Sequence, residues 1–333
     1  MSDVAVFTAR HIERAVPPEV AVEAVREAFV AHARGDWTMP PKIYLTNYPA
    51  GDFRAMPALG GGHALLKWVT SFPGNLLRGL PTVSGAVLLS NAETGELEAL
   101  LDAGAVTALR TGAAAVLAAE ALGRKGADGA TVIGAGANGK AVVRSFLSRG
   151  HLVSVWDIDK ERARRAADDL GASVADSRQK ALSADIVVTV TPGHEVLFST
   201  GSLQPGQHVS LMGADGPGKA EISTGELVRT RSPLVDRPAG DVTRDRDPHV
   251  RLFCDEWEQA SHSGDIARGV ESGQIIREDV TQLGAVLAGD APGRRSPDDI
   301  TIFDSTGLAI QDLAIAIACV ERSGLMDVPR LLL

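Results

Sequence analysis

The chain has 333 residues, 44% of them hydrophobic and 23% charged, which is ordinary for a globular protein and enough for two domains with separate cores. Its formal net charge of −9 argues against nucleic acid or an anionic membrane surface as a general partner. The two cysteines match no metal-ligand spacing, so we expect no metal site. We find no signal peptide and no apolar run that could span a bilayer, and therefore expect a cytoplasmic protein.

The first third of the chain predicts mixed α/β structure. A helix is expected over 18–33, where apolar residues recur at roughly helical spacing behind a pair of prolines. Short apolar runs separated by turn residues then predict strands at 42–45, 52–56, 64–71, 82–90 and 96–102, the last two forming a hairpin. A long helix over 106–122, with unusually small residues in its first turns, follows them.

The stretch from Ala130 to Arg144 organises the rest of the chain. A buried strand over 130–133 runs through Gly134-Ala-Gly-Ala-Asn-Gly139 into a helix over 140–147. In a dinucleotide site, Gly134 permits the tight turn, Gly136 lets the backbone approach a pyrophosphate, and Gly139 lets helix and strand pack closely. The helix N-terminus offers free N–H groups to the phosphates. Because glycine-rich turns also join strands to helices for structural reasons, this pattern is a weak signal when it stands alone.

A second predicted strand, 152–156, strengthens the dinucleotide interpretation. It ends in Asp157, at about the distance past the first glycine where an acidic residue meets the adenosine ribose. A carboxylate there accepts hydrogen bonds from the ribose hydroxyls and repels a 2′-phosphate, which favours NAD over NADP. The alternative is that Asp157 only begins a turn.

The remaining segments continue the alternation of strands and helices. We expect strands at 186–191, 207–212, 252–254 and 301–303, and helices at 160–170 and from Gly307 to Glu321. The first of these strands ends at Thr191, before Pro-Gly, in the manner of a strand that delivers its carboxyl edge to a ligand crevice. Residues 232–250 have no periodicity and predict an exposed excursion.

These elements predict an α/β protein of two domains. The first third of the chain would form a mixed α/β domain, and the strands and helices from 130 onward a Rossmann-type dinucleotide-binding domain. The division is placed at the Gly/Lys/Asp-rich segment that follows the long helix.

Three cationic residues occur among apolar or small neighbours. Lys67 lies inside an apolar strand, where an ammonium must reach water or find an anion. Arg54 and Arg110 carry guanidinium groups suited to binding a carboxylate. The competing interpretations are a solvent-facing lysine on an edge strand and two structural salt bridges.

Two further positions follow predicted strands of the dinucleotide domain. Asp215 stands in a glycine-rich loop, where it could face a ligand crevice or serve as a turn residue. Ser305, with Thr306, could cap the last helix or present that helix N-terminus to the cofactor, and the sequence leaves both open.

Taken together, residues 54–121 and 133–312 resemble the ornithine cyclodeaminase/mu-crystallin family, and within it the archaeal-type alanine dehydrogenase branch. The resemblance covers most of the chain in the family's order and approximate spacing. The matching runs are Phe53-Arg-Ala-Met-Pro57, Leu66-Lys-Trp-Val69, Leu80-Pro-Thr-Val83, Thr94-Gly95, Thr107-Ala-Leu-Arg-Thr-Gly-Ala113, Gly134-Ala-Gly136, Gly213-Ala-Asp-Gly-Pro-Gly-Lys219 and Phe303-Asp-Ser-Thr-Gly-Leu-Ala-Ile-Gln-Asp312.

The resemblance implies that a mixed α/β domain for substrate binding and dimerisation covers 1–122 with 307–333, and that the Rossmann-type domain, 123–306, is inserted between its two parts. The protein is then expected to be a homodimer, with NAD as cofactor and a small amino acid, 2-oxo acid or imine as substrate. It also implies that Lys67 and Asp215 are the catalytic pair, that Arg110 binds the substrate carboxylate, and that Thr111 lies near the phosphates. Ornithine cyclodeaminases carry a glutamate where this chain has Arg54. That departure argues against ring-closing deamination and favours a short, uncharged 2-oxo acid, with Arg54 helping to bind its carboxylate.

The sequence therefore predicts an NAD-dependent oxidoreductase that acts on the CH–NH2 group of a small L-amino acid, in either direction. Three alternatives stay open: a ketimine reductase acting on a cyclic imine acid, an ornithine cyclodeaminase, and a non-enzymatic binding protein of the mu-crystallin kind.

Overall fold

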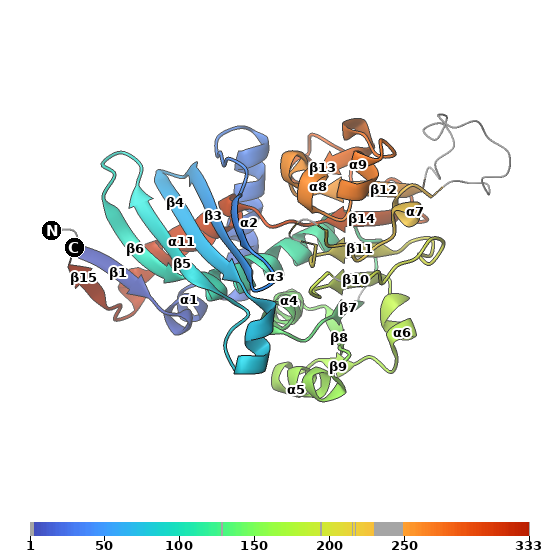
Figure 1. The fold of residues 1–333 in the computed structure, drawn as a ribbon, viewed down its shortest axis with the longest axis horizontal. Coiled ribbons are helices and arrows are strands. Elements are labelled where there is room, and N and C mark those ends of the chain that lie inside the picture. The colour runs from blue at the N-terminus through green and yellow to red at the C-terminus, as the bar shows by residue number, and fades with distance from the viewer. Residues whose placement is uncertain are drawn as a thin grey trace. The chain divides into compact units, whose positions relative to one another are not determined.

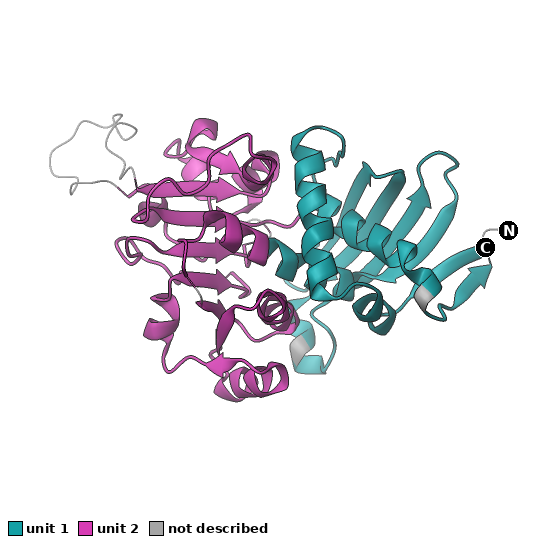
Figure 2. Cartoon of the chain, turned by 180° about the vertical axis from the view of Figure 1, so that it is seen from behind, with its two compact units in different colours: residues 1–114, 308–333 teal, residues 115–307 magenta. Residues whose placement is uncertain are grey.

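The computed structural model describes residues 3–127, 129–193, 195–214, 216, 218–229 and 249–332. The chain forms two compact units, shown in different colours in Figure 2: unit 1 comprises residues 1–114 and 308–333, and unit 2 comprises residues 115–307. The chain thus leaves unit 1, builds unit 2, and returns to complete unit 1. The sequence placed the division at the end of the long helix. The two units instead share that helix, α3 (Ala103–Leu122), as one continuous element.

Unit 1 is built on a seven-stranded sheet with the order β15-β1-β6-β5-β4-β3-β2 (Figure 1). The five predicted strands form its antiparallel part, and two terminal strands that the sequence did not indicate extend it beyond β6. Its elements are β1 (Asp3–Phe7), α1 (Ala9–Ala15), α2 (Pro18–Ala33), β2 (Ile43–Asn47), β3 (Gly51–Gly60), β4 (His63–Ser71), a 3-10 turn η1 (Pro73–Arg78), β5 (Val83–Asn91), β6 (Leu97–Asp102), α11 (Ala309–Glu321), η3 (Ser323–Leu325) and β15 (Arg330–Leu332).

The two faces of the unit 1 sheet differ because side chains alternate along each strand. Met56, Lys67 and Val87 lie opposite one another on β3, β4 and β5 and are all buried. Helix α11 packs on the same three strands and on α2, so that the C-terminal helix completes the core that the N-terminal strands begin. The alternate residues, such as Leu66 and Leu88, face outward and are exposed.

Unit 2 is built on an eight-stranded parallel sheet with the order β13-β12-β14-β11-β10-β7-β8-β9. From β9 to β14 the order is that of a Rossmann domain, with the topological switch point between β7 and β10. Its elements are β7 (Gly129–Ile133), α4 (Ala137–Ser148), β8 (Leu152–Trp156), α5 (Lys160–Leu170), β9 (Ser173–Val174), α6 (Arg178–Leu182), β10 (Ile186–Thr189), β11 (His208–Leu211), α7 (Thr224–Leu227), β12 (Val250–Cys254), α8 (Trp257–Ser263), α9 (Ala267–Glu271), η2 (Arg277–Asp279), β13 (Val280–Gln282), α10 (Leu283–Ala288) and β14 (Ile300–Asp304).

The expectation that no apolar run could span a bilayer was wrong on length and composition. Helix α3 is long and apolar enough to pass such a test. Its apolar stretch is 78% buried inside the protein, however, as a core helix would be. The small apolar residues of α3 raise its mean hydropathy, and their size suits a helix that is packed closely inside the protein. The predicted excursion lies outside the described residues, apart from 249 and 250.

Candidate active site

Lys67 lies on the inner face of β4 and is only 1% exposed. Its Nζ is 2.6 Å from Oδ2 of Asp312, which lies on α11 and is fully buried, and it donates a hydrogen bond of 3.4 Å to Oγ1 of Thr107 on α3. A solvent-facing lysine on an edge strand is therefore excluded. The strand, the C-terminal helix and α3 together hold this ammonium group against a carboxylate.

Burial lowers the pKa of Lys67 from 10.5 to about 8. This pKa already includes the positive charges of Arg110 and Arg54, which lower it, and the charge and hydrogen bond of Asp312, which raise it. A lysine with such a pKa can hold or release a proton close to neutral pH, which is what acid–base chemistry at an amine requires.

Helix α3 brings Arg110 and Thr111 to the same place, because residues three or four apart share a helix face with Thr107. Nε of Arg110 is 3.7 Å from Oδ1 of Asp312, within ion-pair range but too long for a hydrogen bond. Within the described part of the chain, Arg110 Nε, Thr111 Oγ1 and Gln311 Nε2 are buried polar atoms that lack a hydrogen-bond partner. Buried donors are normally satisfied, so these orphaned atoms fit a site that binds a polar ligand.

Arg54 lies on the same inner face of the sheet, on β3. Its Nε donates to Asp52 Oδ1 at 2.6 Å and its Nη2 donates to Asp52 Oδ2 at 3.3 Å. Its guanidinium also stacks over the ring of Tyr44, 5.4 Å from the ring centroid. The structural salt bridge considered for Arg54 is thus present, and Arg110 is the arginine with the less satisfied guanidinium.

Asp312 was not singled out as a functional residue in the sequence, although it closes the last family run. A signal was available: α11 is almost wholly apolar, and Asp312 is the carboxylate within its buried stretch. A buried aspartate in an apolar helix needs a cationic partner. Only the packing of α11 on β4 identifies that partner as Lys67.

The glycine-rich turn of unit 2 has the geometry that its spacing predicts. Gly134 has φ +108°, and a Cβ there would stand 2.5 Å from Val190 O at the end of β10. A Cβ on Gly139 would stand 1.8 Å from Gly134 O, so α4 can approach β7 this closely only with glycine. Gly136 is the N-cap of α4 without a side-chain cap, and a Cβ there would meet nothing within 4 Å. The open space and the helix N-terminus fit a pyrophosphate.

Asp157 follows β8 directly and is 7% exposed. Its Oδ2 accepts the N–H of Ala135 at 2.8 Å, and its Oδ1 accepts the N–H of Asp159 at 2.9 Å. Asp157 thus begins a turn and also fixes the glycine-rich loop beside it. The turn that the sequence offered as the alternative is therefore present, and the role of Asp157 toward a ribose stays a prediction.

Thr191 and Ser305 lie just beyond the carboxyl ends of β10 and β14. Thr191 Oγ1 donates to Glu221 Oε1 at 2.6 Å. The interpretation of Ser305 and Thr306 as helix caps was wrong, because Leu308 is the N-cap of α11. Asp255 binds this segment instead, accepting from Ser305 Oγ, from Oγ1 and N of Thr306, and from the N–H of Gly307. Asp215 lies outside the described residues, and its catalytic role stays a prediction.

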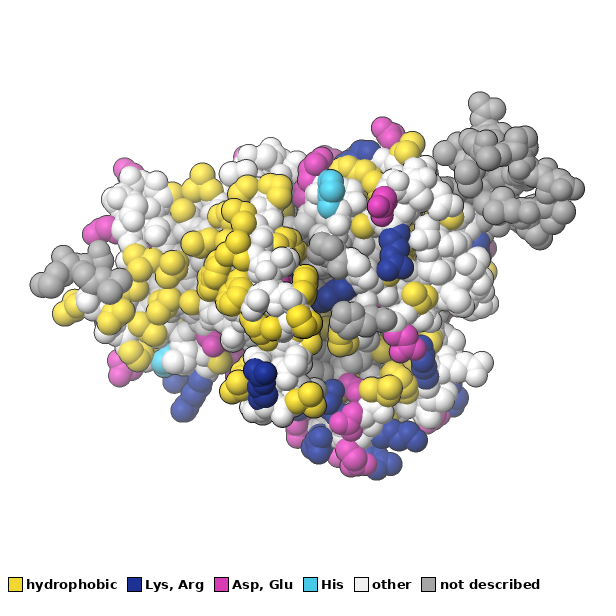
Figure 3. Space-filling model, viewed as in Figure 1, with side chains coloured by type: hydrophobic (Ala, Val, Ile, Leu, Met, Phe, Trp, Pro, Cys, Tyr) yellow, Lys and Arg dark blue, Asp and Glu magenta, His cyan; other side chains and the backbone are white. Residues whose placement is uncertain are grey.

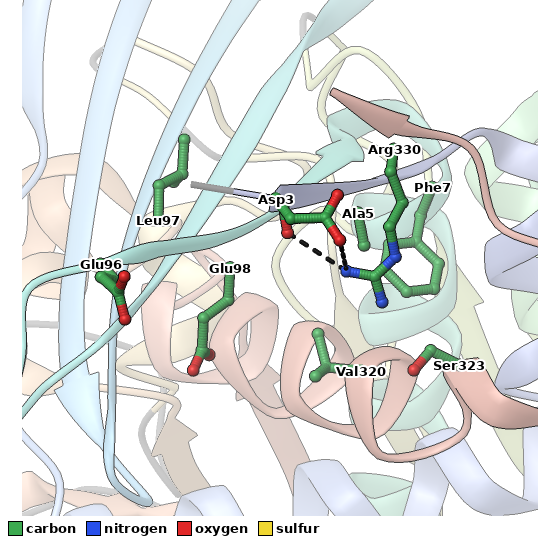
Figure 4. Close-up of a pocket in the computed structure, with 9 residues that line it drawn as sticks. All are labelled: Asp3, Ala5, Phe7, Glu96, Leu97, Glu98, Val320, Ser323 and Arg330. Atoms are coloured by element: carbon green, nitrogen blue, oxygen red, sulfur yellow. Dashed lines mark hydrogen bonds and ion pairs between the residues drawn. The ribbon is translucent and has the colours of Figure 1, made fainter. Parts of the chain in front are cut away.

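A pocket of about 290 Å³ occurs elsewhere in unit 1, at the edge near the termini (Figure 4). Its acidic side chains include Asp3, which is paired with Arg330, and none of its lining residues was a candidate. Among the described residues, no cluster of three or more His, Cys, Asp or Glu side chains could hold a metal ion.

Comparison with known proteins places this geometry in a family. Residues 3–324 match the model of the ornithine cyclodeaminase/mu-crystallin family. The chain belongs to this family. It is 37% identical to an alanine dehydrogenase of Archaeoglobus fulgidus over 96% of this chain and 94% of that protein. It is 32% identical to a Δ1-pyrroline-2-carboxylate reductase of Paracoccus denitrificans, over 89% and 90% of the two chains.

A solved structure of an archaeal alanine dehydrogenase dimer with bound NAD superposes with a TM-score of 0.86, at 36% identity, and covers 99% of each chain. The predicted family, the α/β fold with a Rossmann-type domain, and the class of NAD-dependent oxidoreductase are thereby confirmed. These comparisons do not test the roles of individual residues.

Proposed function

We propose that this protein is an NAD-dependent dehydrogenase of small L-amino acids that carry one carboxylate and an uncharged side chain. It would convert amino acid, NAD and water to 2-oxo acid, ammonia and NADH, or run the reverse reductive amination. The observation that carries this proposal is the buried cluster of Lys67, Arg110 and Asp312, with its orphaned donors. The likeness to an alanine dehydrogenase supports it.

The charges of the cluster support a substrate with one carboxylate. Lys67, Arg110 and Arg54 contribute three positive charges, whereas Asp312 and Asp52 contribute two negative charges. One more anion would balance this face of unit 1, since an uncompensated buried charge is costly. A substrate carboxylate supplies it, and a second carboxylate would find no balancing cation among these residues.

In the proposed mechanism, Arg110 binds the substrate carboxylate and orients the Cα–H bond. Bound NAD would supply the acceptor for the hydride that leaves Cα. Lys67 Nζ pairs with the carboxylate or the carbonyl oxygen and offsets negative charge that develops there. Asp215 is proposed as the general acid–base that moves protons between the amine, or the attacking water, and solvent. Gly134, Gly136, Gly139, Asp157, Thr111, Thr191 and Ser305 are proposed to bind the cofactor.

Reduction of a cyclic imine acid is the second candidate, because the Paracoccus denitrificans relative is a reductase of this kind. Both candidates need the same carboxylate-binding arginine and the same lysine, so the chemistry of the site does not separate them. The cyclodeaminase alternative is weaker. At the position of Arg54, ornithine cyclodeaminases carry a glutamate, whose carboxylate can bind the second amino group of ornithine, whereas Arg54 is a cation and is paired with Asp52. The intact set of Lys67, Arg110 and the three glycines of the dinucleotide turn argues against a protein that only binds a ligand.

The test follows NADH oxidation with ammonia and a panel of 2-oxo acids, beside cyclic imine acids without ammonia. We expect turnover that requires ammonia and is highest for pyruvate or a close relative, with oxaloacetate a poor substrate. Lys67→Met should abolish this turnover, whereas Lys125→Met, an exposed control, should not. Turnover of the cyclic imine alone would move the assignment to an imine reductase, and preference for oxaloacetate would overturn the charge argument.

We also propose that the protein is a homodimer and acts in the cytoplasm, where its two buried, unpaired cysteines would stay reduced. The outward face of β2 to β5 carries apolar side chains that are 36% to 59% exposed, and Figure 3 shows hydrophobic atoms gathered over this sheet. They are Ile43, Leu45, Leu59, Leu66, Trp68 and Leu88. Such a continuous apolar face is typical of a protein–protein interface.

Light scattering of Trp68→Asp tests the dimer. We expect this variant to be a monomer, because a charge in the centre of an apolar interface cannot be solvated. Leu152→Asp, at an exposed leucine on β8 of unit 2, is the control and should keep the wild-type mass. A monomeric wild-type protein, or a dimeric Trp68→Asp, would contradict the proposal.

A further inference from the structure

Glu221 is a fully buried carboxylate of unit 2 that joins two neighbouring strand ends. Its Oε2 accepts the hydroxyl of Thr189 at 2.6 Å and the N–H of Gly213 at 2.9 Å, and its Oε1 accepts the hydroxyl of Thr191 at 2.6 Å. Thr189 and Thr191 belong to the end of β10, and Gly213 follows β11. One side chain therefore ties the carboxyl ends of two parallel strands together.

The segments that Glu221 joins are packed at backbone contact. A Cβ on Gly213 would stand 2.4 Å from Thr191 O, and a Cβ on Gly193 would stand 2.8 Å from Gly213 O. The N–H of Ala220 donates to Gly193 O at 2.9 Å. The loop after β10 and the loop after β11 are therefore so close that a change in the side chain joining them must move backbone atoms.

These loops border the switch point of the sheet, where a Rossmann domain binds its ligand. β10 pairs with β7, the strand that leads into the glycine-rich turn, and a Cβ on Gly134 would stand 2.5 Å from Val190 O. The loop that contains Thr191 therefore lies directly beside the glycine-rich turn that fits a pyrophosphate. Glu221 holds this loop in place through the hydroxyl of Thr191.

An ionised Glu221 can accept from all three of these donors at once. The pKa of Glu221 is raised above its ordinary value by burial, and the hydrogen bonds from Thr189, Thr191 and Gly213 oppose this rise. Its nearest acidic neighbour, Asp265, accepts the N–H of Glu221 itself, and burial raises the pKa of Asp265 well above its usual value. Oδ1 of Asp265 accepts the backbone N–H groups of Glu221 and Ile222.

We propose that Glu221 is a positioning residue for cofactor binding: through Thr191 and Gly213 it holds the two strand-end loops in the arrangement that accepts NAD, without touching the cofactor. The sequence assigned Thr191 to the cofactor. The hydroxyl of Thr191 donates to Glu221. The side chain of Thr191 therefore contributes to cofactor binding by holding its loop in position. This proposal depends on NAD being the cofactor and not on which amino acid or imine is the substrate.

Glu221→Gln tests the role, because the amide keeps the shape of the side chain but places an NH2 group against at least one of the donors. We expect the dissociation constant for NADH, measured by fluorescence titration without substrate, to rise about tenfold or more. Glu226→Gln is the matched control. Glu226 is also buried and accepts backbone N–H groups, from Gly201 and from Leu203, but on a different loop.

Both variants should lower the melting temperature, but only Glu221→Gln should weaken NADH binding. Thr191→Val gives a milder test should Glu221→Gln fail to fold, and we expect a severalfold rise in the dissociation constant. In Glu221→Gln/Thr191→Val the two losses of affinity should be less than additive, because both substitutions remove the hydrogen bond between Thr191 and Glu221. Unchanged NADH affinity in a folded Glu221→Gln, or equal losses in Glu226→Gln, would overturn the proposal. Because no substrate is used, these results stay separate from any failure of the substrate assignment.

Discussion

The pair formed by Lys67 and Asp312 gives the sharpest test of the active-site interpretation. Asp312→Asn removes one charge and keeps the shape of the side chain. Nζ of Lys67 and Oδ2 of Asp312 are 2.6 Å apart and both residues are buried. At an effective dielectric constant of about 20, two charges about 4 Å apart attract each other by about 4 kcal/mol. This attraction corresponds to about three units in the pKa of the lysine.

The pKa of Lys67 should therefore fall well below its value of about 8 in the wild type, because burial and the two arginines would act unopposed. The wild-type lysine is protonated at neutral pH, and activity that needs the ammonium is lost as pH rises through about 8. In Asp312→Asn the same loss should occur at least about two pH units lower. At neutral pH we expect kcat/KM to fall at least about tenfold, since most of the lysine is then neutral.

The assay is the pH dependence of kcat/KM for the best substrate of the panel. Breaking a buried ion pair costs about 3–5 kcal/mol of stability, so thermal melting must show that the variant is folded at the assay temperature. The double variant Lys67→Met/Asp312→Asn should be more stable than Asp312→Asn, because it leaves no buried ammonium without its carboxylate, and like Lys67→Met it should have no turnover. A folded Asp312→Asn with the wild-type pH profile would refute the assignment of this titration to Lys67.

Three further predictions concern the cofactor and stability. Asp157→Ala should weaken NAD binding much more than NADP binding in parallel titrations, and equal losses would show that Asp157 does not bind the ribose. Gly139→Ala should lower both the melting temperature and NADH affinity, because a Cβ there would stand 1.8 Å from Gly134 O, whereas Gly136→Ala should fold normally and lose only affinity. Because burial lowers the pKa of Lys67 from 10.5 to about 8, the unfolded chain binds this proton more tightly. The free energy of unfolding in urea should therefore rise by about 3 kcal/mol as pH increases from about 8 to 10.5, and a rise of the same size in Lys67→Met would contradict this origin.

Several features of this protein follow from local sequence alone. The strand, the three glycines and the helix around Gly134 were readable because each glycine answers a local steric requirement, and the structure reproduces those requirements at Gly134 and Gly139. Short apolar runs separated by turn residues predicted the five strands that form the antiparallel part of the unit 1 sheet. The small residues of α3 were likewise evident from the sequence. The sequence did not indicate that this helix is long and apolar enough to pass a test for a membrane span.

The tertiary structure decided which charged groups meet. Lys67 was a candidate from its apolar strand, but its partner lies on the C-terminal helix, and only the packing of α11 on β4 brings Asp312 to it. Local rules offered Ser305 as a helix cap or as part of a cofactor site, but could not show that Asp255, distant in sequence, binds this segment. Glu221 gave no local signal, since its donors lie on two other segments. Periodicity and turn chemistry act over a few residues, but the pairing of buried charges depends on which elements pack together.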